Sequence, residues 1–143
     1  KDGVNYYFIS RQEFRARIAE NDFLEYDEHF GNFYGTPRSF VERRLRTHSV
    51  ILEIDVVGAL NAKRLMPKET VLIMVTPPSS EELEVRLAAR GSESDEERAA
   101  RLRRVRYELE QAPLYDYVVV NDDLQRTKNE ILQIIRNEKE KTI

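Results

Sequence analysis

The chain of 143 residues is long enough for one domain with a buried core, and its 41% apolar and 34% charged residues are typical of a globular protein. A net charge of −3 argues against general nucleic-acid binding, and the sequence contains no cysteine for disulfides or thiol catalysis and no apolar run long enough to span a membrane. Because no secretory signal pattern is present either, we expect a cytoplasmic protein whose partners are neither nucleic acids nor membranes.

The first 45 residues carry short, mixed secondary-structure signals. Residues 4–10 are β-branched and aromatic and predict a strand. Ser10 and Glu13 have the spacing of a capping box, which predicts a helix through about Glu20. Residues 23–30 and the NFYG that follows predict a hairpin, and a short amphipathic helix is expected over about 39–46.

Three later segments, residues 49–56, 70–78 and 115–120, are nearly continuous apolar runs. Such runs are typical of strands that are buried on both faces. Because helical patterns alternate with them, the sequence predicts a parallel sheet in an α/β fold. The first 45 residues break this alternation and are interpreted as a subdomain beside the parallel core.

Four helices are expected between and after these strands. The first ends at Pro67. Two more begin at the capping patterns of Ser79 and Ser94 and end near Gly91 and Pro113. The last follows the tripeptide NDD, and its apolar residues at helical spacing are Leu124, Ile131, Leu132 and Ile135.

The segment ILEID places Glu53 and Asp55 two residues apart near the carboxyl end of a predicted strand. Both side chains would then share one face at the edge where open parallel sheets bind ligands. Acids on an apolar strand are costly unless they are paired or hydrogen-bonded. They either pair with arginines for structural reasons alone, hold a cation directly or through water, or orient an arginine beside a phosphate.

Glu25 is flanked by apolar residues on a predicted strand. A carboxylate there can accept two hydrogen bonds from neighbouring N–H groups, the pattern that guanine presents through N1–H and its 2-amino group and that adenine lacks. A charged hydrogen bond of this kind is worth roughly 1.5–3 kcal/mol, enough to discriminate between bases. The alternative is a solvated strand glutamate that binds nothing.

Arg90 and Arg101 bracket the very polar segment GSESDEERAA. Arginines at the two ends of such a segment can close on a phosphate and neutralise charge during its transfer. The alternative is a surface helix with solvated ion pairs. A nucleic-acid patch is disfavoured because acidic residues interleave the arginines and no aromatic stacking platform accompanies them.

A series of ordered segments resembles guanylate kinase along essentially the whole chain. These segments are NYYFIS, FLEY with GNFYGTP, ILEIDVVGAL, PPS, RLAARG, ARL and YDYVVVNDDL. The resemblance implies a parallel-sheet P-loop nucleoside monophosphate kinase fold, with a GMP-binding subdomain over residues 4–47, a partial core domain over 48–143 and a lid at about 90–101. It also implies transfer of the ATP γ-phosphoryl group to GMP, giving GDP and ADP, with Mg²⁺ as the cofactor.

The resemblance assigns GMP-binding roles to four residues of the first 45. Tyr6 and Tyr34 match tyrosines whose hydroxyls contact the GMP phosphate. Glu25 and Thr36 match the pair that reads the guanine edge. Tyr26 replaces a commoner tryptophan, a change that we expect to be harmless.

The remaining matches concern the phosphates and the ATP base. Asp55 matches an acid near the phosphates and magnesium, which it would hold through water, and Glu53 stands where the family has Asp or Glu beside the GMP site. Arg90 and Arg101 match lid arginines that reach the transferring phosphoryl group. Asn121 lies where a loop of the family approaches the ATP base.

The sequence departs from the family in one large respect. No G-x-x-x-x-G-K-[ST] pattern occurs, so no phosphate-cradling loop is expected within these 143 residues. The family's strand, P-loop and first helix would precede Lys1, and losing that central strand would be strongly destabilising. We therefore expect a fragment of a kinase that is inactive by itself. The alternative is a catalytically dead guanylate-kinase-like binding module that recognises a phosphopeptide or GMP.

Overall fold

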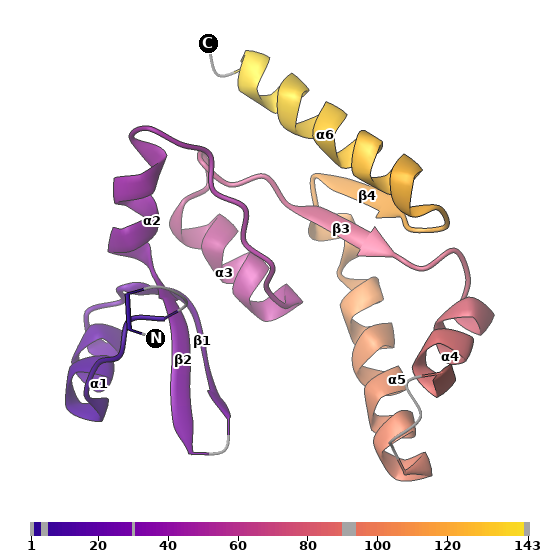
Figure 1. Ribbon diagram of the computed structural model, residues 1–143, viewed down its shortest axis with the longest axis horizontal. Coiled ribbons are helices and arrows are strands. Elements are labelled where there is room, and N and C mark those ends of the chain that lie inside the picture. The colour runs from indigo at the N-terminus through magenta and orange to yellow at the C-terminus, as the bar shows by residue number, and fades with distance from the viewer. Residues whose placement is uncertain (1, 4–5, 30, 90–93, 142–143) are drawn as a thin grey trace. The chain divides into compact units, whose positions relative to one another are not determined.

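The computed structural model describes residues 2–3, 6–29, 31–89 and 94–141. The chain forms two compact units, Lys1–Thr70 and Val71–Ile143 (Figure 1). Their described residues form helices and two small sheets, an α/β composition. Among the described residues, no helix is both long and apolar enough to cross a membrane.

The first unit begins with helix α1, Arg11–Ala19, as predicted. The Glu13 N–H donates to Ser10 Oγ at 3.1 Å, so the expected N-terminal cap is present. Phe14 is the buried residue of α1. Its ring stacks on Phe23 and Phe33, with centroids 4.3 and 5.2 Å apart, and this aromatic cluster attaches the helix to the strands that follow.

The predicted hairpin is confirmed. Strands β1, Phe23–His29, and β2, Asn32–Pro37, pair antiparallel. Gly31 in the turn has a φ of 73°, a conformation that glycine adopts without steric cost. Helix α2, Arg38–Leu45, follows β2 directly, close to the predicted range.

Helix α3, Val56–Leu65, packs against β1 and ends just before Pro67, as predicted. The core of this unit lies between the hairpin and the helices α2 and α3. Its buried residues are Leu24, Val41, Ala62 and Met66.

Two predicted strands are wrong over the residues that the structure describes, which exclude residues 4–5. Residues 49–55 form no strand, and Ile51 is 81% exposed. Residues 7–10 are also irregular, while Tyr6 makes only an isolated parallel bridge to Asp2. A strand needs a hydrogen-bonded neighbour, and none of the described segments pairs with either run beyond that bridge.

The second unit contains a parallel pair of strands, β3, Ile73–Thr76, and β4, Tyr117–Val120, both shorter than predicted. Met74 and Val119 are buried, but Val75 and Val118 are each 47% exposed. Met74 and Val118 are register partners on one face, and Val75 and Val119 are partners on the other, so each face is only partly covered. The prediction of strands buried on both faces is therefore wrong for this sheet.

Helices α4, Ser80–Ala89, and α5, Asp95–Glu110, begin at the predicted caps. The predicted end of α4 near Gly91 lies outside the described residues. Helix α5 ends three residues before Pro113, which lies in the short 3₁₀ helix η1, Ala112–Leu114.

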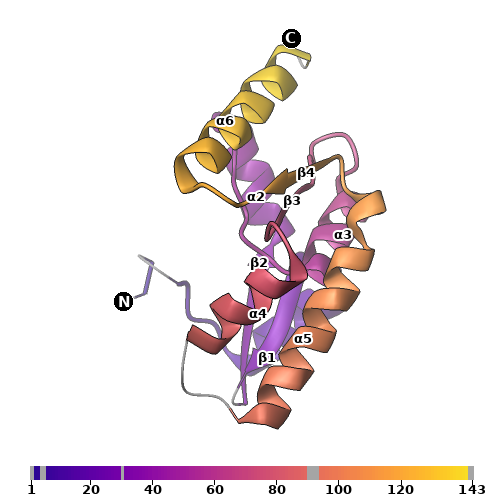
Figure 2. The same cartoon turned by 90° about the vertical axis from the view of Figure 1, so that its right-hand side faces the viewer.

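Helix α6, Leu124–Lys141, packs against β4 (Figure 1, Figure 2). The predicted apolar face is only partly right, since Leu124 is 78% exposed whereas Thr127 and Ile134 are buried. Near the end of α6, Glu138 accepts hydrogen bonds from Lys141 and from the Tyr117 hydroxyl, each at 2.5 Å. The bond from Lys141, and then the bond from Tyr117, lower the pKa of Glu138. The Tyr117 bond also joins the end of α6 to the start of β4.

Candidate functional site

Glu25 and Thr36 face each other across the hairpin. They are register partners on β1 and β2, and both are half-buried. The Thr36 hydroxyl donates to Glu25 Oε1 at 2.6 Å. No described residue donates to the other carboxylate oxygen, Oε2. The pairing fixes one oxygen and leaves the second able to accept hydrogen bonds from a ligand.

The side chain of Glu25 lies over the first turn of α3. Asp55 is the N-cap of that helix, and the Gly58 N–H donates to Asp55 Oδ1 at 2.8 Å. A Cβ on Gly58 would stand 2.7 Å from Glu25 Cβ and 3.3 Å from Asp55 Oδ1. The stem of Glu25 and the carboxylate of Asp55 therefore both lie beside the first turn of α3, where backbone N–H groups favour negative charge.

Tyr6 and Tyr34 also come together. Their rings are in edge contact, with centroids 5.9 Å apart and an interplanar angle of 68°. Tyr34 is on β2, two residues before Thr36, whereas Tyr6 reaches it from outside any strand. Both rings are about half exposed, at 57% and 46%, so solvent and solutes can contact them.

Glu53 is exposed in the irregular segment that leads into α3. It forms no ion pair or hydrogen bond with the described residues, so it is not paired with an arginine for structural reasons there. The prediction that Glu53 and Asp55 share one face of a strand is wrong. Because no strand forms, Asp55 turns into the α3 cap while Glu53 faces solvent.

Only one of the two predicted lid arginines lies among the described residues. Arg90 lies outside the described residues. Arg101 is half-buried on α5, one turn after Glu97. Hydrogen bonds from the Ser94 backbone and hydroxyl lower the pKa of Glu97, and the charge of Arg101 adds to this shift. Elsewhere on α5, Arg104 pairs with Glu108 at 3.0 Å, as the surface-helix alternative expects.

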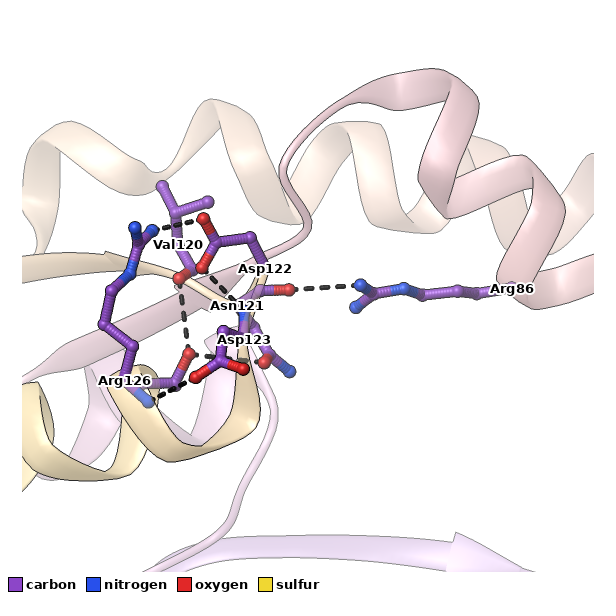
Figure 3. A network of polar contacts seen from close by, with 7 residues as sticks. Arg86, Val120, Asn121, Asp122, Asp123 and Arg126 are labelled. Carbon is purple, nitrogen blue, oxygen red and sulfur yellow. Dashed lines mark hydrogen bonds and ion pairs between the residues drawn. The ribbon is translucent and has the colours of Figure 1, made fainter.

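Asn121 follows β4 within a polar network (Figure 3). Its N–H donates to Thr76 O at 2.7 Å, and Arg86 donates from α4 to its carbonyl at 3.2 Å. Its side-chain Oδ1 lies 3.3 Å from the hydroxyl of the buried Thr127. Further bonds join Asp122 and Asp123 to Arg126, so the loop that carries Asn121 is held at several points.

Two functional candidates were missed by sequence reasoning, Gly58 and Asn61. The Asn61 amide donates to Leu24 O at 2.6 Å, which joins α3 to the residue before Glu25. A glycine inside a helix costs about 1 kcal/mol relative to alanine and usually has a packing reason. That signal could have identified Gly58, whereas no pattern in the sequence distinguished Asn61.

The sequence comparisons and the structure comparison point to the same protein family. A family model described as guanylate kinase matches residues 1–138. Curated guanylate kinases of Thermus thermophilus and Symbiobacterium thermophilum are each 48% identical over 99% of this chain, which covers 64% and 67% of their lengths. A crystal structure of guanylate kinase from Anaplasma phagocytophilum matches with a TM-score of 0.71 and 37% identity over 96% of this chain and 67% of that one. The chain thus spans just under two thirds of the Thermus relative.

Proposed function

The chain belongs to the guanylate kinase family, and from that premise we propose that the protein containing it transfers the γ-phosphoryl group of ATP to GMP, giving GDP and ADP. The observation that carries the proposal is the Thr36–Glu25 hydrogen bond of 2.6 Å beside the first turn of α3. It presents a fixed carboxylate to a ligand, and guanine supplies the matching pair of N–H donors.

The GMP site is proposed to lie in the subdomain of residues 4–47 together with the start of α3. Glu25 and Thr36 would read the guanine edge, and the hydroxyls of Tyr6 and Tyr34 would bind the phosphate. The contact between these two rings supports a shared ligand, since it brings both hydroxyl-bearing side chains to one place. Asp55 and Glu53, in the segment leading into α3, would complete the GMP contacts.

The transfer machinery is proposed for the core domain of residues 48–143 with its lid at about 90–101. Arg90 and Arg101 would neutralise charge on the transferring phosphoryl group, and Asn121 would approach the ATP base. Phosphoryl transfer requires positioning and charge stabilisation rather than covalent help from the protein. ATP and GMP are intracellular metabolites, which supports a cytoplasmic location.

A magnesium ion is proposed as the cofactor, bound together with ATP. Among the described residues, no group of three acidic, histidine or cysteine side chains could hold a metal. Mg²⁺ fits this arrangement because it is commonly bound by one or two carboxylates plus substrate phosphates, with several waters retained. Asp55 is the carboxylate that would hold it through water, and the ion would supply neutralisation of phosphate charge.

The test is phosphotransfer measured as GDP formation from ATP and GMP. We expect no GDP above background from the 143 residues alone, because they contain no P-loop pattern. Fusion to the amino-terminal P-loop segment of a guanylate kinase should produce GDP. Arg101→Ala in the fusion should then reduce the rate at least about a hundredfold, because it removes a charge that stabilises the transition state.

Arg103→Ala is the matched control, since Arg103 is exposed on the same helix and should leave the rate unchanged. A fusion that binds GMP but forms no GDP would contradict the kinase proposal and favour a binding module. GDP formation by the 143 residues alone would show that the triphosphate is held without a P-loop.

A further inference from the structure

Gly58 occupies a position where any side chain would strike Glu25. It is buried in the first turn of α3, and a Cβ there would lie 2.7 Å from Glu25 Cβ and 3.3 Å from Glu25 Cγ. Its φ is not positive, so the helix does not require glycine for backbone reasons. Glycine is therefore needed here for the close approach of the Glu25 side chain.

Asn61 provides a second point of attachment one turn further along α3. Its amide donates to Leu24 O at 2.6 Å, and its own Oδ1 accepts from Arg64 at 2.8 Å. The Arg64 bond orients the amide so that its N–H faces β1. Residues three apart lie on the same side of a helix, so Gly58 and Asn61 together hold the backbone and side chain of the Leu24–Glu25 pair.

From these contacts we propose that Gly58 and Asn61 are positioning residues that determine how strongly Glu25 selects guanine over bases without a 2-amino group. This inference rests on the proposed function, in which Glu25 reads the guanine edge. The Glu25 side chain is restrained at two points, at its carboxylate by Thr36 across the hairpin and at Cβ and Cγ by the close approach of α3. Two simultaneous hydrogen bonds to N1–H and the 2-amino group require that the carboxylate keep one orientation, because hydrogen bonds weaken steeply with angle.

The test is Gly58→Ala in the full 143-residue chain, with GMP and IMP affinities measured by isothermal titration calorimetry. IMP has the N1–H group but lacks the 2-amino group. The added methyl group must displace Glu25, while alanine itself favours the helix, so α3 is not weakened by the change. We expect the ratio of GMP to IMP affinity to fall about tenfold or more, since one charge-assisted hydrogen bond is lost selectively for GMP.

Val57→Ala is the control, because Val57 is 65% exposed in the same helical turn, and the ratio should not change. Asn61→Ala, which adds no volume, should lower the ratio in the same direction even where Gly58→Ala folds poorly. If the ratio of GMP to IMP affinity stayed at the wild-type value in both Gly58→Ala and Asn61→Ala, this inference would be overturned and the proposed function would stand. If the wild-type chain bound GMP no better than IMP, both the proposed function and this inference would be overturned.

Discussion

Replacing Glu25 with glutamine is expected to lower the affinity for GMP about 10- to 100-fold, because two charge-assisted hydrogen bonds to guanine are lost or weakened. The neutral amide keeps the size of the side chain and can still accept from the Thr36 hydroxyl, which donates to Glu25 Oε1 at 2.6 Å in the unchanged chain. Its NH₂ group, however, would face the donors of the guanine edge. Calorimetric titration with GMP measures the loss directly.

Glu28→Gln provides the matched control for this prediction. Glu28 is an exposed residue on the same strand, and because successive side chains of a strand alternate between its faces, Glu25 and Glu28 lie on opposite ones. The change removes the same charge from the chain without touching the proposed base contact. Equal losses of GMP affinity in the two variants would mean that the affinity depends on the net charge of the chain and not on a contact between Glu25 and the guanine edge.

The largest expected effect on stability comes from Leu24→Ala. Leu24 is 2% exposed in the core of the first unit, where it packs with Val41, Ala62 and Met66. Removing its side chain leaves a cavity, and such changes lower the free energy of unfolding by about 2–5 kcal/mol. Urea unfolding followed by far-UV circular dichroism would report the difference.

Ile51→Ala serves as the comparison for that measurement. Ile51 is 81% exposed, and its truncation should change the unfolding free energy by less than about 0.5 kcal/mol. If Leu24→Ala were as mild as Ile51→Ala, the packing of α3 against β1 described here would be wrong, and with it the support of Glu25 from that side.

Local signals predicted much of the first unit. The α1 cap at Ser10, the hairpin around Gly31 and the end of α3 before Pro67 were all predicted, because each depends on residues close in sequence. The capping box of Ser94 on α5 was predicted for the same reason.

Predictions that depended on distant partners had mixed outcomes: the parallel pairing of β3 with β4 is confirmed, but two others failed. The apolar run at residues 49–55 has the composition of a buried strand, but no described neighbour pairs with it. The face of α6 was also misplaced, because packing against β4 buries Thr127 and Ile134 and leaves Leu124 exposed. Amino-acid composition indicates that a segment is apolar enough to be buried, but burial also requires a neighbouring helix or strand that packs against it.

The candidate site also combines a feature set by residues close in sequence with one set by a contact between distant segments. The Glu25–Thr36 pair follows from the hairpin register, so the sequence could place those two residues opposite each other. The contact of Glu25 with Gly58 joins segments more than thirty positions apart and is visible only in the structure. The roles of Arg101 and Asn121 in transfer stay predictions, as does that of Arg90, which lies outside the described residues.

We propose that the first unit carries a guanine-selective nucleoside monophosphate site. The most direct measurement is an amide ¹H–¹⁵N NMR titration of the 143-residue chain with GMP and, at equal concentrations, with AMP. We expect GMP to shift the signals of Glu25, Tyr34 and Thr36 and AMP to shift them far less. Equal shifts with the two nucleotides, or GMP shifts confined to residues 71–143, would contradict this proposal.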